Sequence, residues 1–215
     1  MLPARTSALR GELRSQLGGP PKNKAILSGA FAAALLLPAA ASADMKHEQA
    51  LKDLVESELR AIAENPVVIG ALTQQNTANG SLAQAEIDKL DKQWRSEVEG
   101  QDKSRINQVL ANDLSNYLKK VSDQAGGLYT EIIAMDDKGL NAGQSAVTSD
   151  YWQGDEDKWS KTYAVGPDAV FVDEVEKDES TQMLQSQVSF TIIDPATNQI
   201  IGAITFGVNL DQLGG

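Results

Sequence analysis

The sequence predicts an α+β domain in which long helices come first and an antiparallel sheet follows. Apolar residues recur at helical spacing in the first part of the exported chain, and runs of β-forming residues separated by Asp- and Gly-containing turns fill the second part. The 215 residues, 41% of them hydrophobic, suffice for one domain with a real core. Helices followed by consecutive hairpins are typical of the α+β class.

The first 43 residues have the composition of a secretory signal peptide. Five basic residues and one acidic residue precede an apolar run at 25–40, and the small residues Ala41, Ser42 and Ala43 follow. Signal peptidase reads this pattern. We therefore expect cleavage after Ala43 and a single domain, 44–215, that is periplasmic or secreted. The alternative is a retained membrane anchor, for which the apolar run is short.

Composition excludes several classes of protein. Residues 44–215 would hold 14 basic and 29 acidic residues, a net charge of −15, which argues against nucleic-acid binding. No cysteine is present, so disulfides, thiolate metal sites and a cysteine nucleophile are excluded. A single histidine, His47, excludes a multi-histidine metal site. We find no nucleophile with a base in reach, and we expect a protein that is not an enzyme and needs no cofactor.

Residues 44–126 are predicted to be mainly helical. An apolar stripe from Glu48 to Ala63 predicts one helix, and Pro66 should kink it or begin a second helix. The polar, Asn-rich segment Gln74–Gly80 is predicted to be a linker. Ser81 with Gln84 resembles a capping box for a helix that buries Ile87, Leu90 and Trp94.

One more helix is expected before the sheet. Its apolar stripe covers 104–122, Asp102 or Ser104 can cap its beginning, and Gly126 with Gly127 ends it. The long N-terminal helix has an exposed side as well as an apolar stripe, and such a stripe is more often part of an intramolecular core.

Residues 127–215 are predicted to be mainly antiparallel sheet. Gly139 should take the positive φ of a hairpin turn at 136–139, and Pro195 lies in a second turn at 194–198. The segment Thr148–Tyr163 is neither strand-like nor clearly helical. The expected strands are Leu128–Met135, Leu140–Ser145, Ala169–Val175, Met183–Ile193 and Ile200–Asn209.

This order of elements resembles a Cache domain, the PAS-like extracellular sensor module, and most of all its stand-alone exported single-domain type. The resemblance is carried by Glu131–Gly139, Thr148–Trp159 and Val188–Leu210, and it spans about residues 46–213. It implies an antiparallel PAS/Cache-like sheet with a pocket on its concave face. It also implies a small polar ligand, such as an amino acid, an amine or a short carboxylate.

Members of this family usually sit in membrane kinases or chemoreceptors, and their long N-terminal helix often pairs with its copy, so the resemblance implies a homodimer as one alternative. Here nothing follows Gly215, so we expect no output domain and no direct role as a transmembrane receptor. The expected function is that of an exported sensor domain that passes its ligand state to a separate membrane sensor protein. The alternative is a periplasmic regulatory protein that binds no ligand and works through its helical face.

The segment Thr148–Tyr163 supplies most of the candidate ligand-binding residues. Trp152 and Trp159 would stack on or enclose the ligand, although aromatic residues can equally plug the open face of the sheet. The family's amino-acid-binding version places an Arg among these aromatics, and none lies here, so a bidentate carboxylate clamp is absent. The candidates are Tyr151, Trp152, Trp159, Lys161, Tyr163 and Asp173.

Asp173 would be the acidic member of this site. It follows Phe171 by two residues, so it should point the same way along a strand, and an inward carboxylate needs an amine, a lysine or backbone donors. The alternative is a solvated charge in an acidic turn. The acidic run Asp155–Asp157 lacks the spacing and the central glycine of a calcium loop, so no metal site is expected.

Overall fold

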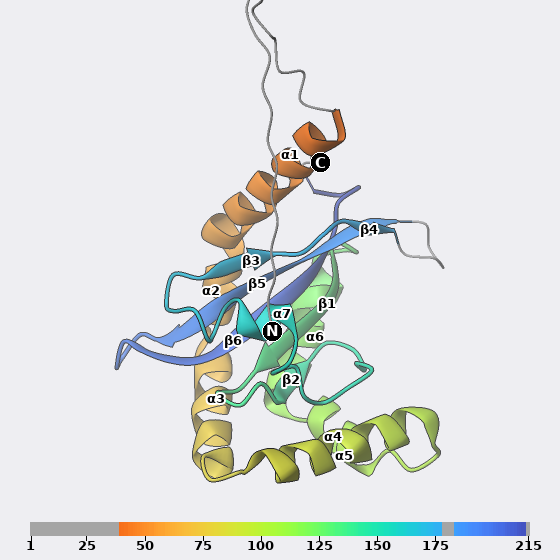
Figure 1. The fold of residues 1–215 in the computed structure, drawn as a ribbon, viewed down its shortest axis with the longest axis vertical. Coiled ribbons are helices and arrows are strands. Elements are labelled where there is room, and N and C mark those ends of the chain that lie inside the picture. Colours follow the sequence, from red (N-terminus) through yellow and green to blue (C-terminus); the bar gives the residue numbers. More distant parts are fainter. Residues whose placement is uncertain (1–38, 178–182, 214–215) are drawn as a thin grey trace, which may run out of the picture. The chain divides into compact units, whose positions relative to one another are not determined.

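An antiparallel sheet is the centre of the fold (Figure 1). The computed structural model describes residues 39–177 and 183–213, which belong to one compact unit, Leu37–Gly215. In these residues the strands follow the order β2-β1-β6-β5-β3, and the short β4 also pairs with β5. The strands are β1 (Tyr129–Met135), β2 (Asn141–Gln144), β3 (Val170–Val172), β4 (Glu176–Lys177), β5 (Leu184–Asp194) and β6 (Gln199–Asn209).

Most of the helices precede the sheet in the chain, as the sequence predicts. They are α1 (Ala39–Leu54), the π-helical turn η1 (Val55–Leu59), α2 (Arg60–Ala63), α3 (Pro66–Asn79), α4 (Gln84–Glu99), α5 (Ser104–Leu110) and α6 (Asp113–Gln124). A seventh helix, α7 (Asp157–Ser160), lies within the segment between β2 and β3. None of the helices in the described part of the chain combines the length and apolarity that a membrane crossing requires.

The two faces of the sheet differ in character because side chains alternate along a strand. On one face Phe190 and Phe206 stack with ring centroids 6.2 Å apart, in a buried core that includes Leu51, Leu72 and Leu118 of the helices. The opposite face is more polar in β5 and β6: Ser189 and Thr205 are fully buried there, with their hydroxyl oxygens 2.9 Å apart. The strands therefore separate an apolar helical layer from a polar face.

Both predicted turns and four of the five predicted strands are confirmed, whereas the strand predicted at Ala169–Val175 is shorter, and β4 was not predicted. β1 and β2 form the expected hairpin, and Gly139 in its turn has a φ of 79°. β5 and β6 form the second hairpin, with Ile193 opposite Ile200. The structure also shows a strand pairing that the sequence does not predict: β1 pairs with β6, not with β5.

Helix α3 begins where the sequence predicts and ends later. Pro66 is its first residue, and the Asn65 side chain caps it by accepting from the backbone N of Val67 at 3.0 Å. The predicted linker at 74–80 is wrong, because α3 continues to Asn79. Its polar side chains are bound by the sheet: Gln75 and Asn79 donate to Asp136 at 2.9 and 2.8 Å. These long-range hydrogen bonds stabilise a helix that local propensity disfavours.

The beginning of α4 lies two residues beyond the predicted one. The carboxylate of Glu86, not the side chain of Gln84, reaches back to the backbone N of Ala83 at 3.0 Å. The Ser81–Gln84 capping box is therefore wrong. The predicted amphipathic face is confirmed, since Ile87 and Trp94 are buried.

The single helix predicted for 104–122 is two helices, α5 and α6. The chain breaks at Ala111, and Asn112 caps α6 by accepting from the backbone N of Ser115 at 2.7 Å. Asn112 also donates to the carbonyl of Ala142 at 2.8 Å. The break thus places one amide side chain between a helix terminus and β2, which the unbroken apolar stripe could not reveal.

The predicted signal peptide falls almost entirely outside the described residues. The description begins at residue 39, and α1 already includes Ala43, the last residue before the expected cleavage point. Cleavage stays a prediction.

Candidate functional site

The chain between β2 and β3 crosses the polar face of the sheet, opposite the helical core. It carries α7, and it packs through Trp159 and Tyr163 against Ile133, Met135 and Ala203 of β1 and β6. This segment covers part of that face, and the part that it leaves open is a candidate binding site (Figure 1).

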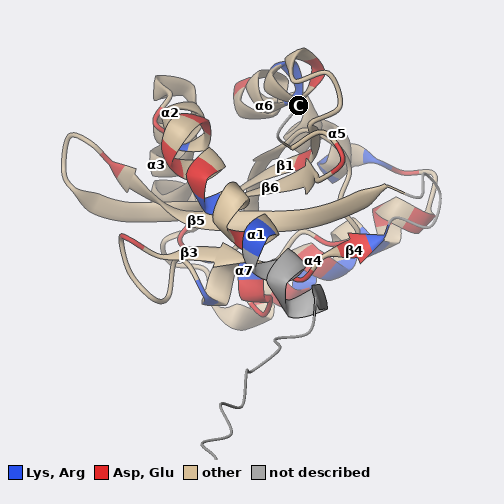
Figure 2. Ribbon diagram, turned by 90° about the horizontal axis from the view of Figure 1, so that it is seen from above, with Lys and Arg blue, Asp and Glu red and all other residues tan. Residues whose placement is uncertain are grey.

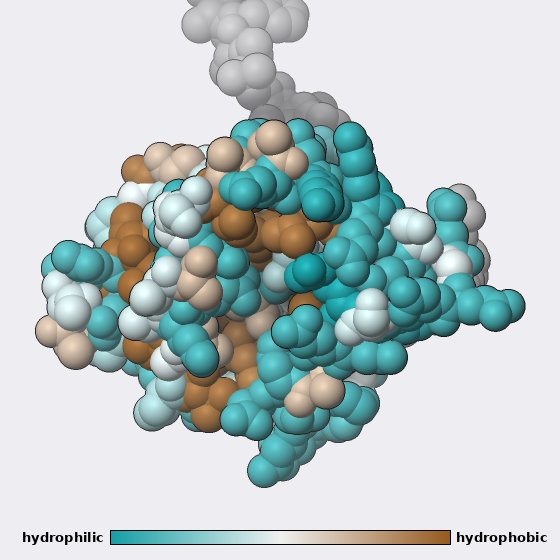
Figure 3. Space-filling view, turned by 90° about the horizontal axis from the view of Figure 1, so that it is seen from below, coloured by the Kyte–Doolittle hydropathy of each residue, from teal (hydrophilic) through white to brown (hydrophobic). Residues whose placement is uncertain are grey.

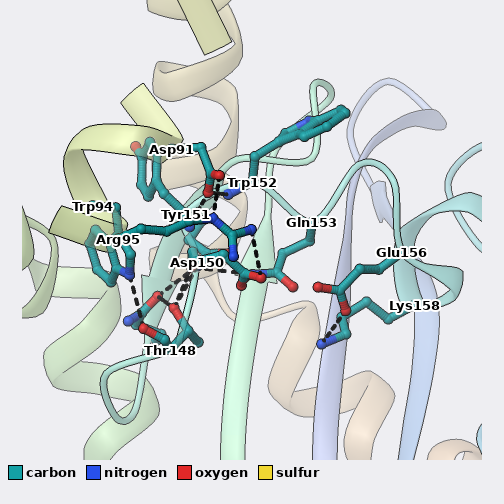
Figure 4. A network of polar contacts seen from close by, with 12 residues as sticks. Asp91, Trp94, Arg95, Thr148, Asp150, Tyr151, Trp152, Gln153, Glu156 and Lys158 are labelled. Atoms are coloured by element: carbon teal, nitrogen blue, oxygen red, sulfur yellow. Dashed lines mark hydrogen bonds and ion pairs between the residues drawn. The ribbon is translucent and has the colours of Figure 1, made fainter. Parts of the chain in front are cut away.

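Helix α4 fixes the beginning of this segment (Figure 4). Asp91 accepts hydrogen bonds from the backbone N of Tyr151 and of Trp152 at 2.9 and 3.2 Å. Arg95 lies between two carboxylates, with Nε 2.7 Å from Asp91 and Nη2 3.2 Å from Asp150. A helix from the first half of the chain thereby holds the segment in place.

The hairpin turn between β1 and β2 fixes two indoles. Nε1 of Trp152 donates to the carbonyl of Lys138 at 2.8 Å, and Nε1 of Trp159 donates to the carbonyl of Asp136 at 3.2 Å. Buried indole N–H groups usually find such a partner. Both donors are therefore used by the protein itself.

The aromatic residues pack on the sheet and on each other. Trp159 stacks on Tyr163 with ring centroids 4.9 Å apart. Lys161 is exposed, with its Nζ 2.7 Å from Asp157 and 4.4 Å from the centre of the Phe171 ring. This arrangement fills the part of the face nearest the hairpin turn.

Tyr151 lies away from the sheet face. Its ring stacks on Trp94 at 5.3 Å in a second apolar cluster with α4 and α5, and the guanidinium of Arg105 lies 5.6 Å above it. Burial raises the pKa of the Tyr151 hydroxyl, and Arg105 opposes this shift. The side chain therefore belongs to the helical half of the protein.

A cavity of about 220 Å³ remains beside α7, and we call it the α7 cavity. It lies between α7, the polar face of β1, β5 and β6, and the segment after β3. Its lining consists of Thr130, Glu131, Glu156, Asp157, Lys158, Asp173, Glu174, Glu176, Gln185, Ser186, Gln187 and Gly207.

Six carboxylates and one lysine line the α7 cavity. Figure 2 shows acidic ribbon on β4 and beside α7. On the floor, Glu131 accepts from Nε2 of Gln187 at 2.7 Å. On the opposite wall, Nζ of Lys158 lies 2.9 Å from Glu156 Oε2, and this lysine side chain is only 12% exposed. Burial raises the pKa of Glu156, Lys158 opposes the shift, and the neighbouring Asp150 adds to it.

The predicted site residues do not come together around the α7 cavity. Asp173 lines it, whereas Tyr151 lies at another cleft and Trp152, Trp159, Lys161 and Tyr163 are not among its lining residues. The expectation that Asp173 is an inward carboxylate is wrong. It is exposed, since β3 is an edge strand that ends at Val172.

A buried polar network lies behind Glu156. Nε2 of Gln153 donates to Asp150 Oδ1 at 2.6 Å, and Nδ2 of Asn141 donates to Gln144 Oε1 at 2.9 Å. Oε1 of Gln153 is buried and has no hydrogen-bond partner, and the same holds for Oδ1 of Asn141 and Nε2 of Gln144. In Figure 4 the Gln153 amide and the Glu156 carboxylate point toward one another.

A second opening, of about 740 Å³, lies between α3, α5 and α6, and we call it the α3–α5 cleft. Its walls include Val67 and Gly70 of α3, and Arg105 and Gln108 of α5, with Tyr151 also in the lining. Figure 3 views the end of this unit that carries α4 and α5 and shows apolar patches among hydrophilic side chains.

Sequence reasoning missed most of the residues that line the α7 cavity. Glu156 lies in the acidic run Asp155–Asp157, Lys158 in the segment Thr148–Tyr163, and Glu131 and Gln187 in expected strands, and none of the four is a predicted site residue. The available signal was the alternation in β5, where Gln185, Gln187 and Ser189 share a face opposite Val188 and Phe190. Polar residues on a covered face indicate a hydrated or ligand-filled space. No cluster of three metal-ligating side chains occurs in residues 39–177 and 183–213.

No protein-family model matches the sequence, and no curated protein matches it. The chain is similar to the V. cholerae histidine kinase DctB sensor domain (12% identity, 79% of this chain and 57% of that chain, TM-score 0.40). It is also similar to the E. coli DcuS sensor domain (14% identity, 79% and 96%, TM-score 0.43). A third is the ligand-binding domain of the Campylobacter jejuni chemoreceptor Tlp3 in complex with 4-methylisoleucine (13% identity, 75% and 64%, TM-score 0.35).

At these identities and TM-scores the likenesses carry no argument about function. The chain spans less than two thirds of the DctB and Tlp3 domains. The order of elements, with a long N-terminal helix, an α7-bearing segment across the sheet and a closing hairpin of β5 and β6, is observed in the chain itself. The protein has the α+β fold that its sequence predicts, with most of its helices before an antiparallel sheet.

Proposed function

We propose that this chain is an exported sensor domain that binds a small polar molecule in the α7 cavity and passes its ligand state to a membrane partner. The observation that carries the proposal is the polarity of the covered sheet face. Beneath α7, Glu131 and Gln187 lie on central strands whose opposite sides carry core residues such as Ile132 and Val188. Glu131 and Gln187 bind each other at 2.7 Å and stay half-buried, and a polar floor of this kind is favoured where polar contents lie against it.

The volume limits the ligand to a small one. About 220 Å³ is below the roughly 300–1,000 Å³ of sites for drug-sized molecules. Amino acids, amines and short carboxylates remain the classes to test. The aromatic residues then act as structural supports of the wall rather than as ligand contacts, since both indole donors are bound to the hairpin turn.

The contacts of α4 offer a route for the ligand state. A ligand in the cavity would touch Glu156 and restrict the segment that Asp91 and Arg95 hold at its beginning. A change in the order of that segment therefore reaches α4, on the helical side of the fold. The partner would read this side of the fold.

The test is a thermal-shift screen of the purified protein against amino acids, amines and short carboxylates. A ligand at 100 times its Kd stabilises a protein by about 2.7 kcal/mol, which is a clear shift. The variant Gln185→Trp should abolish the shift, because it places an indole in the cavity lining. Gln199→Trp, on an exposed position of β6, is the matched control and should keep it.

Two results would overturn ligand binding in this cavity. One is a folded protein whose melting temperature no class of compound changes. The other is a shift that Gln185→Trp leaves intact.

Export is tested separately. We expect the protein purified from outside the cytoplasm to begin at Asp44. An intact N-terminus on membrane-bound protein would support the retained anchor instead.

The α3–α5 cleft supports a second candidate function, a regulatory protein that works through its helical face. A Cβ at Gly70 would meet no atom within 4 Å, so this wall of the cleft is open. Gly70→Arg should therefore fold normally and obstruct the cleft. If this role holds, Gly70→Arg weakens association with the exported part of a membrane sensor, and Gln185→Trp does not.

A further inference from the structure

We propose that the α3–α5 cleft is a second binding site, and that its ligand is a small molecule with a carboxylate group on an apolar body. Arg105 would bind the carboxylate. This inference goes beyond the proposed function, because it concerns the helical side of the fold and not the α7 cavity, and its test does not depend on that cavity.

The shape of the cleft comes from two helices that both pack on β2. Gly70, Ala71 and Ala78 line it from α3, and Arg105 and Gln108, which lie three residues apart on one face of α5, line it as well. The small side chains of α3 leave room between the helices. The volume of about 740 Å³ lies within the roughly 300–1,000 Å³ of small-molecule sites, whereas the α7 cavity is smaller.

Arg105 lacks the counter-charge that the other described arginines have. Arg60 and Arg95 form ion pairs with carboxylates at 2.8 and 2.7 Å. Arg105 forms none with the residues that the structure describes, although acidic residues outnumber basic ones by 30 to 19 in the chain. It is also partly buried, and arginines that leave water usually have a charged partner. An anion in the cleft would supply this partner.

The contacts of the Arg105 guanidinium hold it in place and leave its carboxylate-binding edge available. Nε donates to Gln93 Oε1 at 3.3 Å, and the guanidinium carbon lies 5.6 Å from the centre of the Tyr151 ring. Within the described ranges no carboxylate or carbonyl oxygen accepts from its Nη groups. A guanidinium binds a carboxylate through two parallel hydrogen bonds. A hollow of about 160 Å³, whose lining includes Arg105, Gln108 and Tyr151, gives the carboxylate room at this point.

The charge of this lining differs from that of the α7 cavity. Arg105 is its basic residue and Asp113 its acidic one, and Asp113 is exposed at the beginning of α6. Apart from Tyr151, the other polar side chains of the lining are amides. Those of Gln74 and Gln108 form no hydrogen bond with the part of the chain that the structure describes. An anion would therefore meet an unpaired arginine and free amide N–H donors, whereas a cation would meet one exposed acid.

Apolar side chains in the same lining would hold the body of the ligand. Val67, near the beginning of α3, is 38% exposed, and Leu114 and Ala142 also line the cleft. Covering such surface favours binding, because apolar groups leave water. The lining thus fits a molecule with a negative charge at one end and an apolar body at the other.

The probes separate the charge from the body. Binding of phenylacetate, phenylacetamide, phenethylamine and acetate to the purified protein is measured by isothermal titration calorimetry at fixed ionic strength. We expect phenylacetate to bind and phenethylamine not to bind. Phenylacetamide has a similar shape without the charge, and acetate has the charge without the body, so each should bind at least about tenfold more weakly than phenylacetate.

Four variants locate the site. Arg105→Gln should weaken phenylacetate binding at least about tenfold. Lys92→Gln removes the same charge at an exposed position of α4 and should stay within about twofold of the native protein. Gly70→Trp should abolish binding, because a Cβ at Gly70 would meet no atom within 4 Å and the indole can occupy the cleft. Gln185→Trp, in the α7 cavity, should leave binding unchanged. The melting temperature of each variant without ligand shows that it is folded.

The outcomes separate this inference from the proposed function. Loss of binding in Gly70→Trp together with weakening in Arg105→Gln supports it, whether or not any compound occupies the α7 cavity. Loss in Gln185→Trp alone places the carboxylate in the α7 cavity, which overturns this inference and supports the proposed function. Equal binding of phenylacetate and phenylacetamide overturns the role of Arg105. If the folded protein binds neither of these two probes, or if only a protein partner binds the cleft, the inference is wrong.

Discussion

Arg95 Nη2 lies 3.2 Å from Asp150 Oδ2 and joins α4 to the segment that covers the α7 cavity, although 55 residues separate the two in the sequence. The same guanidinium also holds Asp91, which binds the backbone N–H groups of Tyr151 and Trp152. The ion pair thereby connects the wall of the candidate site with the helical half of the protein.

Arg95→Met should loosen this segment more than it destabilises the whole fold. The Arg95 side chain is 52% exposed, so we expect a loss in unfolding free energy below about 1 kcal/mol. Hydrogen exchange at the amides of Tyr151 and Trp152 should accelerate several-fold. Lys119→Met, which breaks an exposed ion pair within α6, is the control. Unchanged exchange in Arg95→Met would show that Asp91 holds the segment without help.

Trp94 and Trp159 should differ in what their removal costs. Trp94 is fully buried, and Trp94→Ala should lower the unfolding free energy by about 3–5 kcal/mol. Trp159 is only partly buried, so Trp159→Ala should cost less, about 2 kcal/mol. Urea unfolding measures both. A Trp159→Ala protein that keeps full stability would mean that this indole does not support the cavity wall.

Glu97 should make stability depend on pH. Burial opposes its ionisation, but hydrogen bonds from the backbone N of Ile106 and Arg105 and the side chains of Gln93 and Ser104 outweigh burial and lower its pKa. A lowered pKa in the folded state gives stability that is present above the unfolded pKa of about 4.3 and is lost as pH falls through the folded value. Glu97→Leu should therefore cost about 2–3 kcal/mol at pH 7 and less at pH 3.

The matched control for Glu97 is Glu99→Leu on the exposed side of the same helix. It should change stability by less than about 0.5 kcal/mol at either pH. A cost of Glu97→Leu that is the same at both pH values would argue that packing, not the charge, explains it.

Glu156 should give the opposite dependence of stability on pH from that of Glu97. Burial raises its pKa, Lys158 lowers it, and Asp150, itself paired with Arg95, raises it further. A raised pKa in the folded state gives stability that is present below the unfolded pKa and is lost as pH rises through the folded value. The native protein should therefore gain stability relative to Glu156→Gln as pH falls from 7 toward 4. Parallel stability curves for the two proteins would contradict this.

Gly139→Ala should disturb the hairpin turn that holds the indoles. Its φ of 79° disfavours any side chain, and a Cβ there would lie 2.6 Å from Cα of Gly154. We expect a loss of more than about 1 kcal/mol and a changed Trp152 fluorescence. Gly166→Ala, where φ is also positive but a Cβ would meet no atom within 4 Å, separates crowding from strain. Equal losses would mean that contact with Gly154 contributes nothing.

Local signals in the sequence were enough for the class of fold and for most of its elements. Hydrophobic periodicity located the helices, and the residues at 136–139 and 194–198 located both hairpins, because turn chemistry acts between close neighbours. The predictions are wrong where contacts between residues far apart in the sequence determine the local structure. Helix α3 continues through a polar segment because Asp136, 57 residues beyond Asn79, accepts from its side chains.

The site shows the same division. The sequence indicated that the segment Thr148–Tyr163 lies on the sheet. It also predicted that the aromatic residues of this segment contact a ligand, but they do not line the α7 cavity. The indole N–H groups of Trp152 and Trp159 donate to backbone carbonyls of the hairpin turn. The ring of Tyr151 packs on Trp94 of α4. Residue type alone could not tell a supporting indole from one that contacts a ligand.

The sequence by itself thus determined an α+β chain with a leader-like N-terminus, an acidic surface and a loop across an antiparallel sheet. Tertiary structure alone decided that Glu131, Gln187, Glu156 and Lys158 meet at one cavity. The physical reason is that strand pairing and the packing of α7 on the sheet bring β1, β5 and α7 together. Neither kind of contact can be predicted from local sequence composition. The direction of an unpaired amide oxygen at Gln153 depends on the same assembly.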